Sequence, residues 1–282
     1  MRLSTLDTGH RMRARLFFAL TGRGDAPDIV RTLLYRPDFF ARPFLAITVA
    51  AMRGPSYWSA GEREYLAMRT AQRHRCPFCA ESHTELTRIA SHGEINPDDS
   101  NTTRPELRAV RAFLDDTTGD QAPRKVDGVP ESAIREALRV DLVWNVVNRL
   151  ANAFGFTLRS DQLRTGPRAL HRFGYKFPGF LLSGGTPTPG DPITALRHAV
   201  FDAPAHTDPA LRRATADPDT LDEPWRSYAA LVRDASYRIT DADITRLTDA
   251  GHSQDAIFEI TVAAAVGAAL HAFDTGQHAL AQ

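Results

Sequence analysis

The two cysteines of this chain lie three residues apart, in the segment Cys76-Pro77-Phe78-Cys79, and the 282 residues contain no others. His83 follows the second cysteine by four residues. Positions three and four apart share one face of an α-helix, so a helix here would gather both sulfurs and the imidazole. The thiolate is the reactive form of cysteine, and a helix N-terminus and a nearby imidazole both lower a thiol pKa. The spacing therefore predicts a reactive cluster in which His83 accepts a thiol proton.

The cysteine spacing also suits reversible disulfide formation. At a helix start it brings the two Cα atoms to roughly 5–6 Å, a distance that a disulfide spans. In a reducing compartment a structural disulfide gains little, so the pair indicates redox or metal chemistry. Glu64 precedes Cys76 with eleven residues between them, and its carboxylate is a candidate for orienting His83 through a hydrogen bond. Spacing alone does not single Glu64 out, because the chain has 34 acidic residues.

Other interpretations of these residues stay open. Thiolate and imidazole are ligands that zinc prefers, although a structural zinc site usually takes a second ligand pair from elsewhere in the fold. A non-enzymatic redox sensor, and an oxidoreductase that exchanges disulfides with a protein partner, use the same pair. The attacking cysteine is also undecided at this point, because Cys79 is nearer to His83 whereas Cys76 is nearer to the helix start.

The elements around the cluster are predicted to be helices. Ser59 and Glu62 form a capping-box pattern at the start of a helix through about residue 74. A second helix begins near Cys76, with Pro77 in its first turn, and stops at Gly93. Two longer helices are expected at about 132–153 and 253–275. Strand patterns are scarce, so the sequence predicts an all-α fold.

The two long helices also form a weak internal repeat. A shift of 123 residues places Gly128 on Gly251, Ile134 on Ile257, Glu136 on Glu259 and Val143 on Val266. The stretch between the copies is rich in proline and glycine, which is typical of a connection. We therefore expect a catalytic helical domain at 1–173, a linker at 174–192, and a degenerate repeat without cysteines at 193–282.

Composition limits the partners. Lysine plus arginine and aspartate plus glutamate both number 34, so no net field favours nucleic acid. Arginines interrupt the apolar residues of the N-terminal segment, which does not resemble a secretory signal, and we expect a cytoplasmic protein. The apolar stretch 256–273 approaches the length of a membrane span but contains Glu259 and His271, so it is predicted to be a buried core helix without a membrane partner.

Residues 37–93 resemble the alkylhydroperoxidase D (AhpD) branch of the carboxymuconolactone decarboxylase superfamily. That branch is marked by a glutamate, eleven residues, and then C-x-x-C-x-x-x-H, and Glu64, Cys76, Cys79 and His83 match it at every position. The segment RGPSYWSAGERE ahead of the motif is also similar to members of the family. The decarboxylase branch lacks the cysteine pair, so CPFC argues against that assignment.

The resemblance implies an AhpD-like helical bundle of two fused units, of which the second is degenerate. It also implies a peroxidase that reduces organic hydroperoxides, without a cofactor or metal. Carried over by position, Cys79 attacks the peroxide, Cys76 resolves the sulfenic acid, and His83 and Glu64 form the proton relay. The implied partners are a dithiol reductant, either a dihydrolipoyl carrier or a thioredoxin-like protein, and further copies of the chain in a homodimer or trimer. Phe78 departs from those members that have a histidine before the second cysteine.

Overall fold

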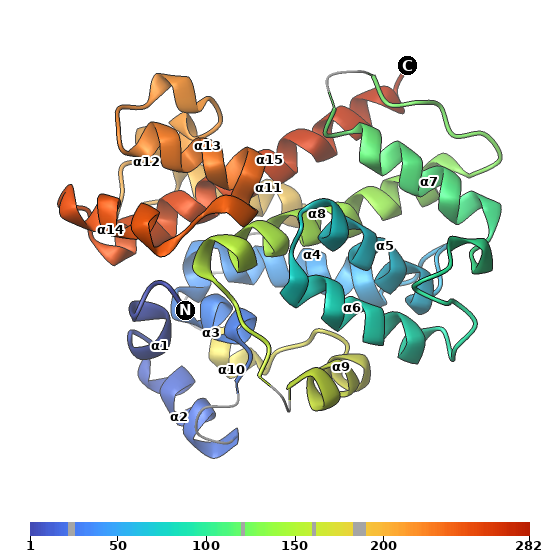
Figure 1. The fold of residues 1–282 in the computed structure, drawn as a ribbon, viewed down its shortest axis with the longest axis horizontal. Helices are drawn as coiled ribbons and strands as arrows, with labels where there is room; N and C mark the ends of the chain where they lie inside the picture. The colour runs from blue at the N-terminus through green and yellow to red at the C-terminus, as the bar shows by residue number, and fades with distance from the viewer. Residues whose placement is uncertain (22–25, 120–121, 160–161, 183–189) are drawn as a thin grey trace.

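The computed structural model describes residues 1–282 except 22–25, 120–121, 160–161 and 183–189 (Figure 1). Its regular secondary structure is entirely helical in the described part of the chain, so the predicted all-α class is confirmed. The α-helices are α1 (Thr5–Thr8), α2 (Met12–Thr21), α3 (Asp28–Tyr35), α4 (Arg42–Arg53), α5 (Ala60–Arg73), α6 (Pro77–Ala90), α7 (Pro105–Asp116), α8 (Glu131–Phe154), α9 (Gln162–Phe173), α10 (Gly179–Leu182), α11 (Pro192–Arg197), α12 (Pro209–Ala214), α13 (Trp225–Ala235), α14 (Asp241–Asp249) and α15 (Gln254–Ala279). Short π or 3₁₀ turns are η1 (Pro37–Ala41), η2 (Ser100–Thr102), η3 (His198–Asp202), η4 (Pro218–Thr220) and η5 (Ser236–Arg238).

The helix boundaries near the cysteines follow from local capping. The Ser59 hydroxyl accepts a hydrogen bond from the Glu62 amide at 3.2 Å, and the Glu62 carboxylate accepts one from the Ser59 amide at 2.8 Å. This is the predicted capping box, and it starts α5. Cys76 is extended at the N-cap of α6 and Pro77 is its first helical residue. Proline suits that position because its missing N–H has no partner in the first turn of a helix.

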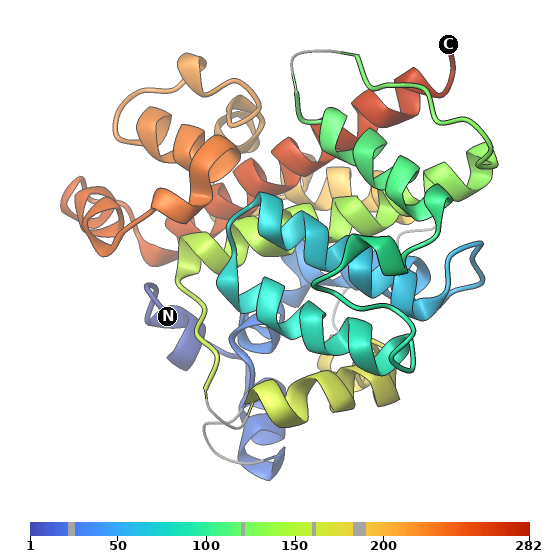
Figure 2. The same cartoon turned by 45° about the vertical axis from the view of Figure 1, so that its right-hand side comes forward.

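A tight turn folds α5 and α6 into a helical hairpin. Arg75, between the two helices, has a left-handed φ of 51°, and the Cys76 amide donates back to the Ala71 carbonyl at 3.0 Å. Gly61 lets the start of α5 approach the end of α6 closely, because a Cβ at this position would lie 2.6 Å from the Cβ of Ser91. The hairpin places the middle of α6 against the first half of α5, and α9 packs on α6 (Figure 2).

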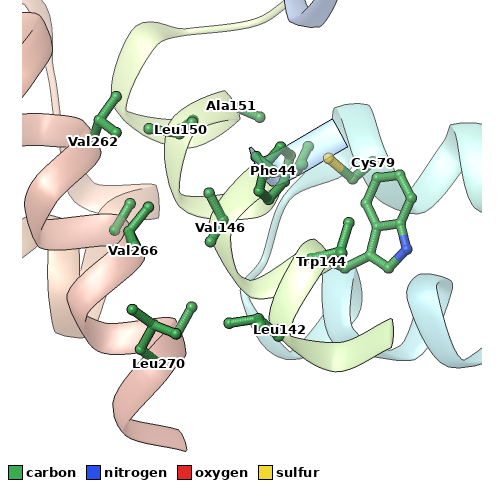
Figure 3. Packing of buried hydrophobic residues seen from close by; sticks show 14 of the residues in the cluster. Phe44, Cys79, Leu142, Trp144, Val146, Leu150, Ala151, Val262, Val266 and Leu270 are labelled. Carbon is green, nitrogen blue, oxygen red and sulfur yellow. The ribbon is translucent and has the colours of Figure 1, made fainter. Parts of the chain in front are cut away.

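The long helices α8 and α15 lie side by side through the centre of the molecule (Figures 1 and 2). Figure 3 shows Leu142, Val146 and Leu150 of α8 facing Val262, Val266 and Leu270 of α15. Trp144 and Ala151 emerge on the other side of α8, toward Cys79 and Phe44. One face of α8 therefore forms the central core, while the opposite face reaches the cysteine hairpin.

The helix α15 is the one described segment long and apolar enough to cross a membrane by length and composition. In the folded chain, however, 78% of its apolar window is buried. Its side chains belong to the same hydrophobic cluster as those of α4, α5 and α8. This burial agrees with the prediction of a core helix.

The predicted linker at 174–192 is more than a connection. Its first part, residues 174–182, contains the short helix α10 and the buried residues Tyr175 and Leu181. Residues 183–189 of that prediction lie outside the described residues. Tyr175 has a left-handed φ of 64°, which is uncommon for a residue other than glycine and recurs at functional sites.

Candidate active site

Glu64, on α5, is the centre of a buried polar cluster. Its side chain is completely buried, and each of its oxygens has more than one partner. Arg53, at the end of α4, donates from Nη2 to Oε1 at 2.6 Å, and His83 of α6 contacts Oε2 through Nδ1 at 2.8 Å. The Tyr175 hydroxyl lies 3.0 Å from both oxygens and donates to the carboxylate. A buried carboxylate is stable only when it is paired and hydrogen-bonded in this way.

These partners keep Glu64 ionised. Burial by itself raises the pKa of the carboxyl group, because a charge is poorly solvated inside the protein. The hydrogen bond and charge of His83, together with those of Arg53, outweigh burial and lower the pKa below its ordinary value. Glu64 is therefore an acceptor that holds the proton on Nδ1 of His83. This hydrogen bond leaves Nε2 as the ring nitrogen available for proton transfer.

An aromatic contact also orients His83. The indole ring of Trp144 meets the imidazole edge-on, with ring centroids 3.9 Å apart and an angle of 70° between the planes. Trp144 is itself fixed, because its Nε1 donates to the sulfur of Met52 at 3.2 Å and its ring lies 5.9 Å from that of Tyr175. The imidazole is thus held by Glu64 at one nitrogen and by Trp144 at its ring, and it is almost fully buried.

Both cysteines are reduced and buried at the start of α6, each 1% exposed. A hydrogen bond from Cys79 lowers the pKa of the Cys76 thiol despite burial, and the backbone amides of Cys79 and Phe78 add to this effect. Burial raises the pKa of Cys79 well above its ordinary value, and the neighbouring Cys76 thiolate adds to the increase. Cys76 is therefore the thiol of the pair that loses its proton more readily, and the helix N-terminus stabilises the thiolate there.

Tyr175 closes the cluster from the chain segment after α9. Its ring packs under the guanidinium of Arg53, 5.0 Å from the centroid. Burial and the charge of Glu64 raise the pKa of the phenol well above its ordinary value, so the hydroxyl stays protonated and donates. Its pKa also responds to the charge on Cys79, which places the phenol in the electrostatic environment of the cysteine pair. Tyr175 is therefore a member of the site.

The hairpin contains the four residues selected from the sequence, and it pairs Glu64 with His83 and Cys76 with Cys79. Cys76 stands at the N-cap, just before the helix, so the expectation that both sulfurs and the imidazole lie on one helical face holds only for Cys79 and His83. Sequence reasoning missed Arg53, Trp144 and Tyr175. No spacing links them to the motif, since Trp144 and Tyr175 come from α8 and from the predicted linker, far along the chain.

His74, the C-cap of α5, belongs to a second polar cluster. Its Nε2 lies 2.7 Å from Oδ1 of Asn145, and burial together with Arg149 and Arg73 lowers its pKa well below the ordinary value. The neutral imidazole is part of a polar network between α5 and α8. That network adjoins the cysteine hairpin.

The surroundings of the cluster limit what it can bind. A cavity of about 290 Å³ beside α4 is lined by residues such as Ile47, Glu136 and Ile193, and by none of the four motif residues. Across the described part of the chain, no three histidine, cysteine, aspartate or glutamate side chains gather so that they could hold a metal ion.

Comparisons with known proteins add no assignment to this geometry: no family model matches the chain, and no curated protein sequence matches it.

Proposed function

We propose that the protein is a thiol peroxidase that reduces organic hydroperoxides through Cys76 and Cys79. The observation that carries the proposal is the buried contact between His83 and Glu64, in the middle of a helix at whose start two reduced cysteines lie. A nucleophile, a base and a third group that orients the base are the parts that an activated thiol needs. The resemblance of the motif to the alkylhydroperoxidase D branch supports the same reaction.

The proposed cycle balances in two steps. The Cys79 thiol loses its proton to Nε2 of His83, and the imidazolium is stabilised by Glu64. The thiolate attacks the terminal oxygen of the hydroperoxide, so that an S–O bond forms, the O–O bond breaks, and the alkoxide takes the proton from His83 to leave as alcohol. The Cys76 thiol then passes its proton to His83 and attacks the sulfenic sulfur of Cys79, so that the S–S bond forms, the S–O bond breaks, and the hydroxide takes the proton from His83 and leaves as water. An external dithiol restores the reduced pair.

Two arguments about the attacking cysteine point in opposite directions. The resemblance and the helical proximity to His83 assign attack to Cys79. The pKa directions instead make Cys76 the thiol that loses its proton first. Such a coupled pair loses its first proton as a unit, so a charge on Cys76 before substrate binds is compatible with attack by Cys79 once His83 accepts the second proton. We therefore retain Cys79 as the peroxidatic residue.

Reductant and substrate must both reach a buried site. Both cysteine residues are 1% exposed, and α9 packs on α6. A small dithiol such as a dihydrolipoyl group enters such a site more easily than the surface of a folded protein does. We therefore propose a dihydrolipoyl-type carrier as the reductant, with a thioredoxin-like protein as the alternative, and a homodimer or trimer as the assembly.

The test is consumption of cumene hydroperoxide with a dithiol donor by the wild type, Cys79→Ser and Cys76→Ser, with zinc measured on the same samples. Turnover that is lost in both variants, with sulfenic acid trapped on Cys79 in Cys76→Ser, would support the cycle. Stoichiometric zinc without turnover would identify a metal site and refute the peroxidase.

A thiol–disulfide oxidoreductase is the second candidate. The observation that favours it is the lowered pKa of Cys76 at the helix N-terminus, the position of the attacking cysteine in thioredoxin-like motifs. Such an enzyme would reduce or oxidise a protein disulfide rapidly and would react with hydroperoxide no faster than a free thiol does. Comparing the two rates on the same protein separates the candidates.

We further infer that the chain contains two related units, on the evidence of matching contacts. Arg63 in α5 and Arg212 in α12 each donate to two backbone carbonyls of the preceding turn. The acceptors are Ala51 and Gly54 for Arg63, and Val200 and Ala203 for Arg212. One shift of 149 positions carries residues 51, 54 and 63 onto 200, 203 and 212.

The same shift of 149 positions also carries the turn that follows these carbonyl groups in the first unit onto the corresponding turn in the second, because it places residue 57 on residue 206. The Tyr57 amide donates to Glu136 of α8 at 2.8 Å, and the His206 amide donates to Glu259 of α15 at 2.8 Å. Glu136 and Glu259 are the pair that the internal repeat already matched. Between α12 and α13 the chain forms only the short turn η4, so the second unit contains no counterpart of α6. We propose that it lost the whole redox helix and retained the framework.

A further inference from the structure

Asn148, in the middle of α8, is a buried polar side chain that the proposed cycle does not use. It is fully buried, and neither its amide nitrogen Nδ2 nor its amide oxygen Oδ1 has a hydrogen-bond partner among the residues that the structure describes. No other described residue has two unpaired buried side-chain polar atoms. Buried amides are nearly always paired because an unmade hydrogen bond destabilises the fold, so this one requires an explanation.

Contacts on both sides of Asn148 locate the surface that it faces. One turn earlier, Trp144 meets the ring of His83. One turn later, Asn152 donates from Nδ2 to the carbonyl oxygen of His74 at 2.9 Å. Residues four apart lie above one another on a helix, so Asn148 lies between these two contacts.

The cysteine pair occupies that interval on the opposing hairpin. His74 precedes Cys76 by two residues and His83 follows Cys79 by four, so the surface between the two histidines is the segment with the sulfurs. Figure 3 shows Trp144 and Ala151 on the side of α8 that faces Cys79. Asn148 follows Trp144 by four residues and precedes Ala151 by three, so it lies on this same face of α8, opposite the start of α6.

We infer that Asn148 binds the hydroperoxide group of the substrate, an inference that rests on the proposed peroxidase function. A hydroperoxide has one O–H donor and two acceptor oxygens, and the amide supplies one acceptor and one donor. The hydroperoxide O–H donates to Oδ1, and Nδ2 donates to the alkoxy oxygen. When the cysteine thiolate forms the S–O bond and the O–O bond breaks, charge develops on that alkoxy oxygen before His83 protonates it. A donor aimed at developing charge accelerates such a step.

The side chains around this position suit an alkyl substituent. Phe44, Trp144 and Ala151 border Cys79 in Figure 3, and all three are buried. An organic hydroperoxide places its polar group on the amide and its carbon chain against these apolar groups. Hydrogen peroxide gains only the first interaction. The inferred substrate class is therefore an alkyl or aryl hydroperoxide.

The test compares Asn148→Leu with the wild type in a single turnover of the reduced protein with cumene hydroperoxide. The reaction is monitored by the loss of free thiols. Leucine has the same branching and the same number of side-chain heavy atoms, and it removes both unpaired polar atoms. We expect the second-order rate constant to fall about 100-fold, while the melting temperature stays the same or rises. Alkylation of the cysteines by iodoacetamide, an electrophile that does not need the amide, should keep its wild-type rate.

Asn152→Leu is the matched control. Asn152 lies on the same face of α8, but its Nδ2 donates hydrogen bonds to the carbonyl oxygen of His74 and to the hydroxyl of Ser236. Its melting temperature should fall. If Asn148→Leu also loses stability and its peroxide and alkylation rates fall in proportion, Asn148 only supports the fold and the inference is wrong. An unchanged peroxide rate in Asn148→Leu overturns the inference alone, whereas a wild type that does not react overturns the proposed function too. Asn148→Ala, measured identically, replaces the leucine variant if that variant does not fold.

Discussion

Nδ1 of His83 lies 2.8 Å from Oε2 of Glu64, and both groups are buried although they belong to different helices. The contact exists because the left-handed turn at Arg75 folds α6 back along α5. It fixes which nitrogen of His83 faces the carboxylate, and it places an ionised group behind the base. The proposed chemistry depends on this relationship, and each prediction below perturbs a part of it.

Glu64→Gln removes the charge and keeps the shape of the side chain. Because the pKa of Glu64 is lowered in the folded protein, its ionisation stabilises the fold above the ordinary carboxyl value of 4.5. That contribution is lost as the pH falls through the folded-state pKa. Removing one partner of a buried pair costs about 3–5 kcal/mol. Urea unfolding should therefore show a large difference between wild type and variant at pH 7 and a diminishing one below pH 4.5. A difference that does not depend on pH would show that the charge of Glu64 is not what stabilises the site.

Arg53→Met leaves Glu64 without the guanidinium of Arg53, and the proposed second unit offers a control for it. Under the shift of 149 positions, Arg53 and Glu64 correspond to Asp202 and Arg213, an ion pair of opposite order at 2.8 Å. The Arg53 pair is buried at its carboxylate, whereas both side chains of the Asp202 pair are about half exposed. Arg53→Met should cost about 3–5 kcal/mol in unfolding free energy, and Arg213→Met about 0–1 kcal/mol. Equal losses would contradict the account.

Tyr175→Phe tests the hydroxyl without removing the ring that packs beside Trp144. The carboxylate of Glu64 loses a donor to both oxygens, so its pKa should rise and the acid limb of the rate profile should move to higher pH. The hydrogen bond to a charged group is worth about 1.5–3 kcal/mol, so kcat/KM should fall at least tenfold. Tyr57→Phe, at a half-exposed position, is the control and should behave as wild type. An unshifted pH profile would reduce Tyr175 to a packing residue.

Cys79→Ala probes the coupling between the two sulfurs. The hydrogen bond from Cys79 is the main reason why the pKa of Cys76 lies below its ordinary value of 9.0. Without that donor the Cys76 pKa should rise toward 9.0, which titration of the thiolate absorbance between pH 5 and 10 measures. In Cys76→Ala, burial alone should still keep the pKa of Cys79 raised. A Cys76 pKa that does not change in Cys79→Ala would show that the backbone amides, rather than the second thiol, stabilise the thiolate.

Local signals in the sequence predict the framework of this site well. The capping box at Ser59 and the first-turn Pro77 place α5 and α6 within a few residues of their observed bounds, and the two longer helices expected at 132–153 and 253–275 match α8 and α15 equally closely. Glu64 and His83 come together because the turn at Arg75 is short. Contacts from distant elements have no such signal. Tyr175 comes from a stretch whose glycine and proline content indicates only a connection, and Asn148 looks like one more polar residue on an amphipathic helix.

The most direct test of the central claim is the mass of the reduced protein after one equivalent of cumene hydroperoxide and alkylation of the remaining thiols. The account predicts loss of both free thiols, a disulfide between Cys76 and Cys79, and one equivalent of alcohol, at a rate that falls sharply in Glu64→Gln. Two thiols that remain alkylatable, with the hydroperoxide unconsumed, would contradict it.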